Sequence, residues 1–270
     1  MLPLVWPPQA FTTMEAEPPH RETPANLLRE LLIAIATLSR WALFARREFG
    51  DSEQRARAMV FLPIIGLVAG IAFAFIDRTI TAVLSPMARS FIVILFIEVV
   101  AGGLDALGIA DLVDAIRIGS RPASTGLARI GPVGALAAIA WFIATASLLA
   151  RIHDPASRSG ALVMASMLSR WSMVPIGYGL RPLERWGLGV PYEGPIRFRE
   201  FSVSSAIALA LTMALYENVG LAVIVVLALT ILAMRLALSR RLGGAAGYAL
   251  AGGMAICELI VFATMALLTR

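Results

Sequence analysis

The chain has 270 residues, of which 59% are hydrophobic and only 15% are charged, and its formal net charge is +5. A soluble domain usually carries about a quarter charged residues, and the apolar residues here come in long blocks, so the composition excludes a soluble globular fold. All 23 basic residues are arginine. They lie mostly in short stretches between the apolar blocks, as expected for signals of membrane orientation, so the positive charge does not indicate a nucleic-acid partner.

The first 25 residues are rich in Pro and Glu. This composition predicts a disordered extension before a single transmembrane domain over residues 26–270. The first apolar block, at 27–44, carries three charged residues and is expected either to span the membrane or to lie in its interface. The single cysteine, Cys257, excludes an internal disulfide and a cysteine-based metal cluster.

Further apolar blocks predict an all-α fold. A membrane span needs about 20 apolar residues, and a backbone in lipid must satisfy its own hydrogen bonds, so we expect a bundle of about seven to eight transmembrane helices. Glu217 and Asn218 are expected to form the turn of a hairpin. The blocks are Val60–Ile76, Ser90–Leu104, Ile130–Ala150, Gly160–Leu180, Val203–Tyr216, Val219–Met234 and Leu242–Leu268.

The distribution of arginine predicts the orientation of the bundle. The segments at 45–59, 105–129, 181–202 and 235–241 fall on one side and hold 14 arginines, whereas the other side holds five. Because arginine is enriched in cytoplasmic loops, the Arg-rich side is expected to be cytoplasmic.

Candidate chemistry is concentrated between residues 102 and 131, which read GGLDALGIADLVDAIRIGSRPASTGLARIG. Asp111 and Asp114 are three residues apart, so on a helix they share one face. Two such carboxylates suit Mg²⁺, which prefers oxygen ligands and keeps substrate phosphates in its coordination shell. From the spacing alone, a solvated acidic turn at the membrane surface is the favoured interpretation, and a metal site is the alternative.

Two charged residues lie inside apolar blocks, where a charge is costly and usually faces the bundle interior or a cavity. Arg170 is expected to bind a substrate phosphate or to pair with Glu98 or Glu258; the alternative is that it extends to the membrane surface. Glu258 is expected to be a metal or proton partner, or part of an internal salt bridge. If Arg170 and Glu258 line a path through the bundle, a small transporter is a further hypothesis.

The acidic segment resembles the signature of the adenosylcobinamide-GDP ribazoletransferase family, also called cobalamin synthase. That signature reads approximately G-x-x-H-x-D-G-x-A-D-x-x-D-G, and a second stretch with R-I-G and G-A follows it. The residues in register are Gly108, Ala110, Asp111 and Asp114, then Arg129-Ile130-Gly131 and Gly134-Ala135. Other similar motifs occur in order over residues 27–268, at Phe61–Gly70, Leu168-Ser169-Arg170-Trp171, Gly187-Leu188-Gly189, and Gly243–Gly247 with Leu250 and Glu258.

The chain departs from this pattern at several acids. Asp105 stands where the family has His. It lies six residues before Asp111, about 240° around an ideal helix, so a bend at Gly108 would be needed for both carboxylates to point the same way. Acids of the family pattern are replaced at Leu107, Leu127, Tyr248 and Ala255.

The resemblance implies an enzyme of the bacterial cytoplasmic membrane, surrounded by lipid, that joins α-ribazole or its phosphate to adenosylcobinamide-GDP and releases GMP. Its substrate would be a corrinoid nucleotide. Because several acids are missing, the alternative is an inactive homologue that serves as an accessory or scaffold subunit of a membrane complex; a homo-oligomer is also left open. The implied residues are Asp111, Asp114 and Arg129 for catalysis, Ser169, Arg170, Gly243 and Gly244 for substrate, and Asp111, Asp114 and Glu258 for Mg²⁺.

Overall fold

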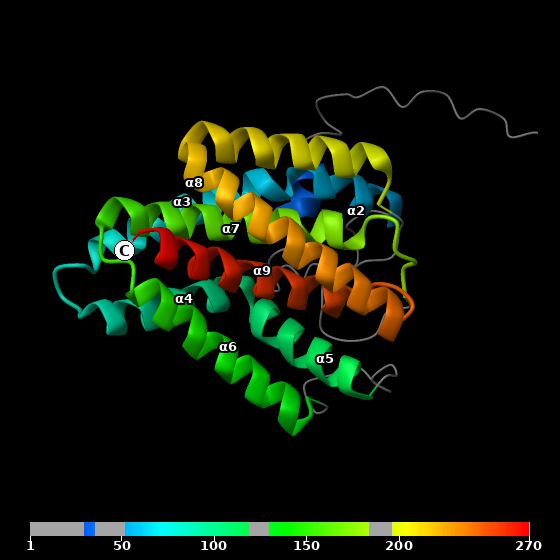
Figure 1. The fold of residues 1–270 in the computed structure, drawn as a ribbon, viewed down its shortest axis with the longest axis horizontal. Coiled ribbons are helices and arrows are strands. Elements are labelled where there is room, and N and C mark those ends of the chain that lie inside the picture. Colours follow the sequence, from blue (N-terminus) through cyan, green and yellow to red (C-terminus); the bar gives the residue numbers. More distant parts are fainter. Residues whose placement is uncertain (1–29, 36–51, 119–129, 184–195, 270) are drawn as a thin grey trace, which may run out of the picture.

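The computed structural model describes residues 30–35, 52–118, 130–183 and 196–269. Within these ranges the chain is helical and contains no strand, which confirms the predicted fold class. A helical stretch at 30–35 precedes the helices that Figure 1 shows packed into one bundle. They are α2 (Ser52–Ala58), the 3-10 helix η2 (Met59–Phe61), α3 (Leu62–Thr79), α4 (Pro86–Ala101), α5 (Leu104–Ile118), α6 (Pro132–Ala150), α7 (Pro155–Gly177), α8 (Phe198–Arg241) and α9 (Gly247–Leu268). The predicted extension at 1–25 and most of the 27–44 block lie outside the described residues.

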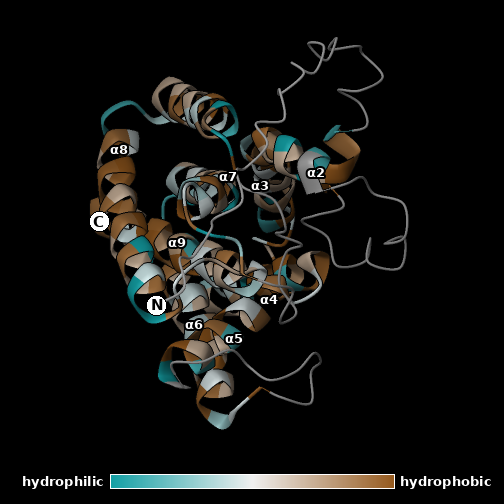
Figure 2. Cartoon of the chain, turned by 90° about the vertical axis from the view of Figure 1, so that its right-hand side faces the viewer, coloured by the Kyte–Doolittle hydropathy of each residue, from teal (hydrophilic) through white to brown (hydrophobic). Residues whose placement is uncertain are grey.

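The outer surface of the bundle is apolar. Val68, Phe75 and Leu136 are 62%, 70% and 66% exposed, and Figure 2 shows hydrophobic residues along the outward faces of the helices. Exposed apolar surface of this extent marks contact with lipid or protein. Four helical segments of the described chain are long and apolar enough to cross a membrane, at Gln54–Thr79, Pro132–Ala150, Phe198–Arg241 and Gly247–Leu268, and the bent pair α4–α5 would add a fifth. The chain is therefore a membrane protein.

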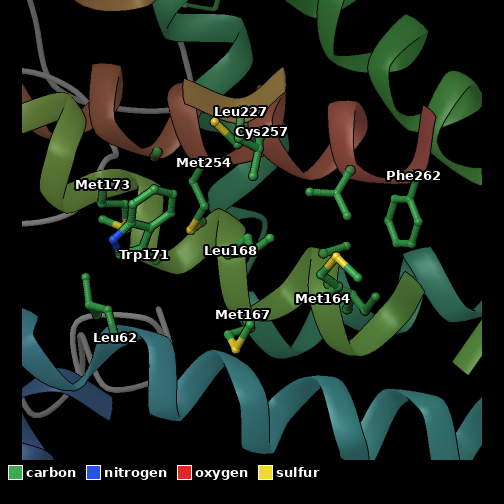
Figure 3. Close-up of a cluster of buried hydrophobic side chains, with 14 of the residues drawn as sticks. Leu62, Met164, Met167, Leu168, Trp171, Met173, Leu227, Met254, Cys257 and Phe262 are labelled. Atoms are coloured by element: carbon green, nitrogen blue, oxygen red, sulfur yellow. The ribbon is translucent and has the colours of Figure 1, made fainter. Parts of the chain in front are cut away.

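Helix α7 forms the centre of the bundle. All of its residues from Gly160 to Gly177 are buried, and α3, α8 and α9 pack around it. Figure 3 shows Met164 and Trp171 of α7 in a shared apolar core with Met254 and Phe262 of α9. Because its neighbours shield α7 from lipid, this helix tolerates two arginines and five serines in its sequence.

Glycines allow α3 to approach the backbone of α7. A Cβ atom at Gly66 would lie 2.5 Å from the carbonyl oxygen of Ser166, and one at Gly70 would lie 2.7 Å from the Cα of Val163. Small residues permit this kind of close helix packing in membranes. Gly66 and Gly70 of the Phe61–Gly70 motif therefore have a packing role in this structure.

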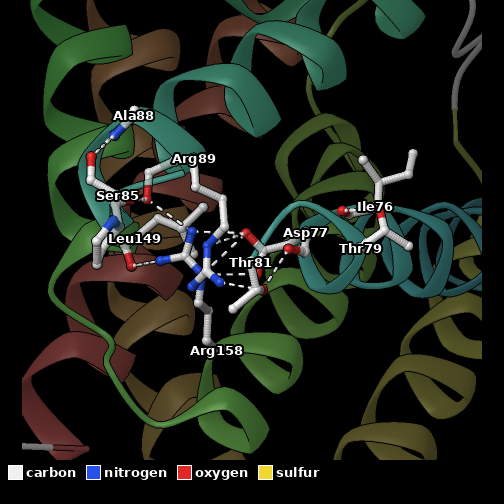
Figure 4. A network of polar contacts seen from close by, with 11 residues as sticks. Ile76, Asp77, Thr79, Thr81, Ser85, Ala88, Arg89, Leu149 and Arg158 are labelled. Atoms are coloured by element: carbon white, nitrogen blue, oxygen red, sulfur yellow. Dashed lines mark hydrogen bonds and ion pairs between the residues drawn. The ribbon is translucent and has the colours of Figure 1, made fainter. Parts of the chain in front are cut away.

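A buried network of charges joins four helices at one end of the bundle (Figure 4). Arg158, which is 1% exposed, donates hydrogen bonds to both carboxylate oxygens of Asp77, the shortest at 2.8 Å. It also donates to the carbonyl of Leu149 at 2.6 Å and to Ser90 Oγ at 2.9 Å. Arg89 Nε lies 3.3 Å from Asp77 Oδ1. One carboxylate of α3 thus anchors α4 and α7, while Arg158 also reaches the end of α6.

A bend and a reversal of the chain shape the rest of the bundle. Gly102 and Gly103 both adopt left-handed conformations, with φ of 69° and 74°, and α4 and α5 meet there at an angle of 82°. Within α8 the helix is broken at Glu217, with φ of 42°, and the two halves run back along each other (Figure 1). The tight turn brings Gly220 against Thr212, so the predicted hairpin around Glu217 and Asn218 is confirmed.

The close α3–α7 contact predicts that Gly66→Ala destabilises the bundle. The added methyl group collides with the α7 backbone, and overpacking of this kind typically costs about 1–3 kcal/mol. We expect a lower midpoint of thermal unfolding in mild detergent. Ala72→Leu, at an exposed position of the same helix, is the matched control and should leave the midpoint unchanged. Equal midpoints for Gly66→Ala and the wild-type protein would contradict the packing assigned here.

Candidate active site

Several of the residues singled out in the sequence lie at the end of the bundle opposite Asp77 and Arg158. Here α5 ends, α6 begins, and α9 follows the end of α8 (Figure 1). The turn before α9 is tied to the chain after α7, since the Leu183 N–H donates to the carbonyl of Ala245 at 2.8 Å and the Ala245 N–H donates to that of Arg181 at 3.0 Å. This end also displays exposed arginines, namely Arg117, Arg181, Arg240 and Arg241.

Asp114 is held by the first turn of α6. Its Oδ2 accepts the Gly131 N–H at 2.7 Å and its Oδ1 accepts the Gly134 N–H at 3.1 Å. The side chain is buried. The N-terminus of a helix favours a negative charge because its first N–H groups have no partner within the helix. Both carboxylate oxygens of Asp114 are therefore engaged by the backbone of α6.

Asp111, one turn earlier on α5, is half-buried. The two predicted catalytic aspartates thus lie in different surroundings, although they are three residues apart. Arg129, the third predicted catalytic residue, lies outside the described residues.

A second set of charged residues lies inside the bundle, beside the α4–α5 bend. Arg170 Nη1 is 3.8 Å from Glu258 Oε2 and donates a hydrogen bond to Ser169 Oγ at 2.9 Å. Arg170 and Glu258 are 5% and 1% exposed. The prediction that Arg170 pairs with Glu258 is therefore confirmed, whereas a contact of Arg170 or Ser169 with substrate remains a prediction.

Asp105 and Glu98 complete this buried set. Asp105 is 0% exposed and lies within electrostatic range of Arg170 and Glu98, and Glu258 lies within range of Asp105. Glu98 Oε2 accepts the Ala106 N–H at 3.3 Å and so caps the start of α5 across the bend. Neither oxygen of Asp105 accepts a hydrogen bond from the described residues. Arg170 thus lies near the carboxyl groups of Glu258 and Asp105, and Glu98 lies beside Asp105.

Reasoning from the sequence did not bring Asp105 into this set. The sequence predicted that Asp105 could point the same way as Asp111 only with a bend at Gly108, and α5 continues through Gly108 without one. Gly108 packs against the backbone nitrogen of Gly252 in α9. The bend is at Gly102 and Gly103, so Asp105 faces Glu98 and Arg170. The sequence feature that indicates this bend is the pair of glycines directly before the acidic helix, because glycine readily adopts left-handed backbone conformations.

The two glycines before α9 have different surroundings. Gly243 adopts a left-handed conformation with φ of 72°, and a Cβ atom there would meet nothing within 4 Å. A Cβ atom at Gly244 would lie 2.3 Å from the carbonyl oxygen of Arg181. Gly244 is therefore needed for the close approach of two chain segments, and the predicted role of both glycines in substrate binding is untested.

The predicted Mg²⁺ ligands are not brought into one group. Asp114 is engaged by α6, and Glu258 pairs with Arg170 in the buried set. Among the described residues no three or more His, Cys, Asp or Glu side chains are arranged to hold a metal ion. The residues described here do not fit a metal site built from the protein alone.

The fold and this end of the bundle define a polytopic membrane protein with acidic and cationic groups at one end. The sequence profile of the cobalamin-5-phosphate synthases matches residues 30–266, and the chain belongs to this family. It is 28% identical over 248 residues to the adenosylcobinamide-GDP ribazoletransferase of Klebsiella pneumoniae subsp. pneumoniae, covering 87% of this chain and 98% of that protein. It is 27% identical over 220 residues to the protein of the same name from Syntrophobacter fumaroxidans, covering 79% and 88%. No solved structure matches the chain.

The buried set predicts that Arg170→Met strongly destabilises the protein. Removing one partner of a buried ion pair leaves uncompensated charge and typically costs about 3–5 kcal/mol. We expect a large drop in the thermal unfolding midpoint in detergent. Adding Asp105→Asn should recover part of the loss, because it removes one of the carboxylates that Arg170→Met leaves without a counter-charge. Arg240→Met, at an exposed position, serves as the control. The assignment is wrong if Arg170→Met and Arg240→Met unfold at the same temperature.

Proposed function

We propose that this chain transfers the adenosylcobinamide phosphate group of adenosylcobinamide-GDP to α-ribazole, or to its phosphate, and releases GMP. The observation that carries the proposal is the family match across residues 30–266. The names of the two relatives add support, because each matches this chain over most of both lengths. No finding favours the alternative of an inactive accessory subunit.

The reaction requires a ribose hydroxyl to attack a phosphorus atom of the diphosphate while GMP leaves. Its barrier is mainly electrostatic, since charge on the transferring group must be neutralised and the reacting atoms held in line. The exposed arginines at the α5–α6 end provide a positive field that would attract an anionic nucleotide. This feature supports placing the substrate there, beside the half-buried Asp111.

Mg²⁺ remains part of the proposal as the ion that would neutralise phosphate charge. In proteins it is commonly held by one or two carboxylates together with substrate phosphates. Of the three predicted ligands, Asp114 and Glu258 are buried, and Asp111 is half-buried. The ion would therefore depend on the bound diphosphate for most of its ligands.

The location of the protein belongs to the same proposal. We infer that the chain lies in the cytoplasmic membrane of a bacterium, with the arginine-rich end of the bundle in the cytoplasm. The enrichment of arginine in cytoplasmic loops supports this orientation. A homo-oligomer or a complex with other subunits remains a prediction.

The proposal is tested with purified protein in lipid nanodiscs, supplied with adenosylcobinamide-GDP, α-ribazole and Mg²⁺. We expect product and GMP in equal amounts, and we expect Asp111→Asn to lower kcat by on the order of a hundredfold, the typical effect of removing one electrostatic group from an active site. Asp154→Asn, which changes an exposed carboxylate at the other end of the bundle, should keep full activity. Folded wild-type protein that forms no GMP under these conditions would rule the activity out.

A further inference from the structure

Two motifs of the chain meet at Asp114. It comes from α5, whereas Gly131 and Gly134, whose N–H groups it accepts, belong to the next motif at the start of α6. Gly131 is the N-cap residue of α6 and has no side chain with which to cap the helix. Asp114 therefore supplies, from the preceding helix, the acceptor that an Asp or Ser would normally provide at that position.

The carboxylate also explains why both partners are glycine. A Cβ atom at Gly131 would lie 2.8 Å from Asp114 Oδ2, and one at Gly134 would lie 2.4 Å from the same oxygen. Gly131 has φ of −69° and ψ of 161°, which any residue adopts, so its backbone conformation does not require glycine. Glycine is required because the Asp114 carboxylate occupies the space that a Cβ atom would take.

Asp114 and Asp111 consequently have separate tasks. Asp111 lies three residues earlier, about 4.5 Å along the helix axis, and is half-buried. The hydrogen bonds of Asp114 fix the last turns of α5 against α6, and with them the position of Asp111. These bonds engage both carboxylate oxygens of Asp114 without a metal ion.

We propose that Asp114 is a positioning residue that sets the placement of Asp111 by capping α6, and that it is not a ligand of Mg²⁺. This inference rests on the proposed function, because the placement of Asp111 matters only if substrate binds at this end. It assigns to one acid of the metal-like motif a role that the spacing of the acids does not reveal.

Gly131→Ala is the sharpest variant. Its methyl group displaces the Asp114 carboxylate, but the substitution removes no acidic residue. Asp114→Asn is its partner, since the amide turns an NH₂ group towards one of the two N–H donors. Asp154→Asn is the matched control. Asp154 also caps a helix, accepting the Ser157 N–H at 2.7 Å at the start of α7, and this bond holds the pKa of its carboxyl below the usual value.

Turnover is measured in nanodiscs over a Mg²⁺ titration, well below the unfolding temperature of each variant. We expect Gly131→Ala and Asp114→Asn each to lower kcat by about tenfold or more, because small misplacements of catalytic groups are costly. The Mg²⁺ concentration at half-maximal rate should rise less for Gly131→Ala and Asp114→Asn than for Asp111→Asn, because the first two variants displace the proposed Mg²⁺ ligand whereas the third removes it. Asp154→Asn should match the wild-type kcat and KM.

Two outcomes would overturn the inference. One is a rise in the half-saturating Mg²⁺ concentration for Asp114→Asn that equals or exceeds the rise for Asp111→Asn. The other is a wild-type kcat in Gly131→Ala, because a purely structural contact would leave the rate of folded protein unchanged.

A thermal unfolding cycle separates this inference from the proposed function. If Asp114 and Gly131 act through one contact, both single variants lower the unfolding midpoint, and the double variant unfolds no earlier than the less stable single one. Additive losses would refute the contact. Wild-type protein without turnover would end the proposed function. This cycle would still decide the role of Asp114, together with Mn²⁺ binding measured on Asp114→Asn, Asp111→Asn and the wild-type protein. A loss of Mn²⁺ binding in Asp114→Asn as large as that in Asp111→Asn would refute the positioning role.

Discussion

The bundle depends on burying two arginines of α7 without leaving their charges unpaired. A guanidinium in the interior of a membrane protein is costly unless acceptors surround it. Arg158 is paired with Asp77 of α3 at one end of the bundle, and Arg170 with Glu258 of α9 nearer the other. These two pairs tie α3 and α9 to the central helix α7.

Close helix contacts then transmit this arrangement to the candidate site. Gly108 of α5 packs on Gly252 of α9, so the acidic helix is placed by the same helix that carries Glu258. The bend before α5 turns it away from the direction of α4 and towards α6, where Asp114 caps the next helix. The half-buried carboxylate of Asp111 is thus positioned by contacts that reach back to the central helix.

The sequence was a good guide to the helices and to the pairing of Arg170, but it did not predict the buried pair of Arg158 and Asp77. Long apolar blocks predict spans because lipid leaves the backbone no other partner, and a lone Arg170 between apolar residues requires an acid such as Glu258. The local geometry of the site was less accessible. Asp114 pairs with backbone N–H groups, which every residue except proline carries, so no residue pattern predicts this contact. The direction of the Asp105 side chain depends on left-handed conformations at Gly102 and Gly103.

The path of the chain through the bundle separates its C-terminus from the candidate site. Helix α9 begins beside the turn at Gly243 and Gly244 and runs to the end where Asp77 and Arg158 meet, and Figure 1 shows the C-terminus there. A fluorescent reporter or affinity tag fused after Thr269 would therefore emerge at the end of the bundle opposite the one where we propose that the nucleotide binds. Immobilising the protein through such a tag would leave the α5–α6 end open to water.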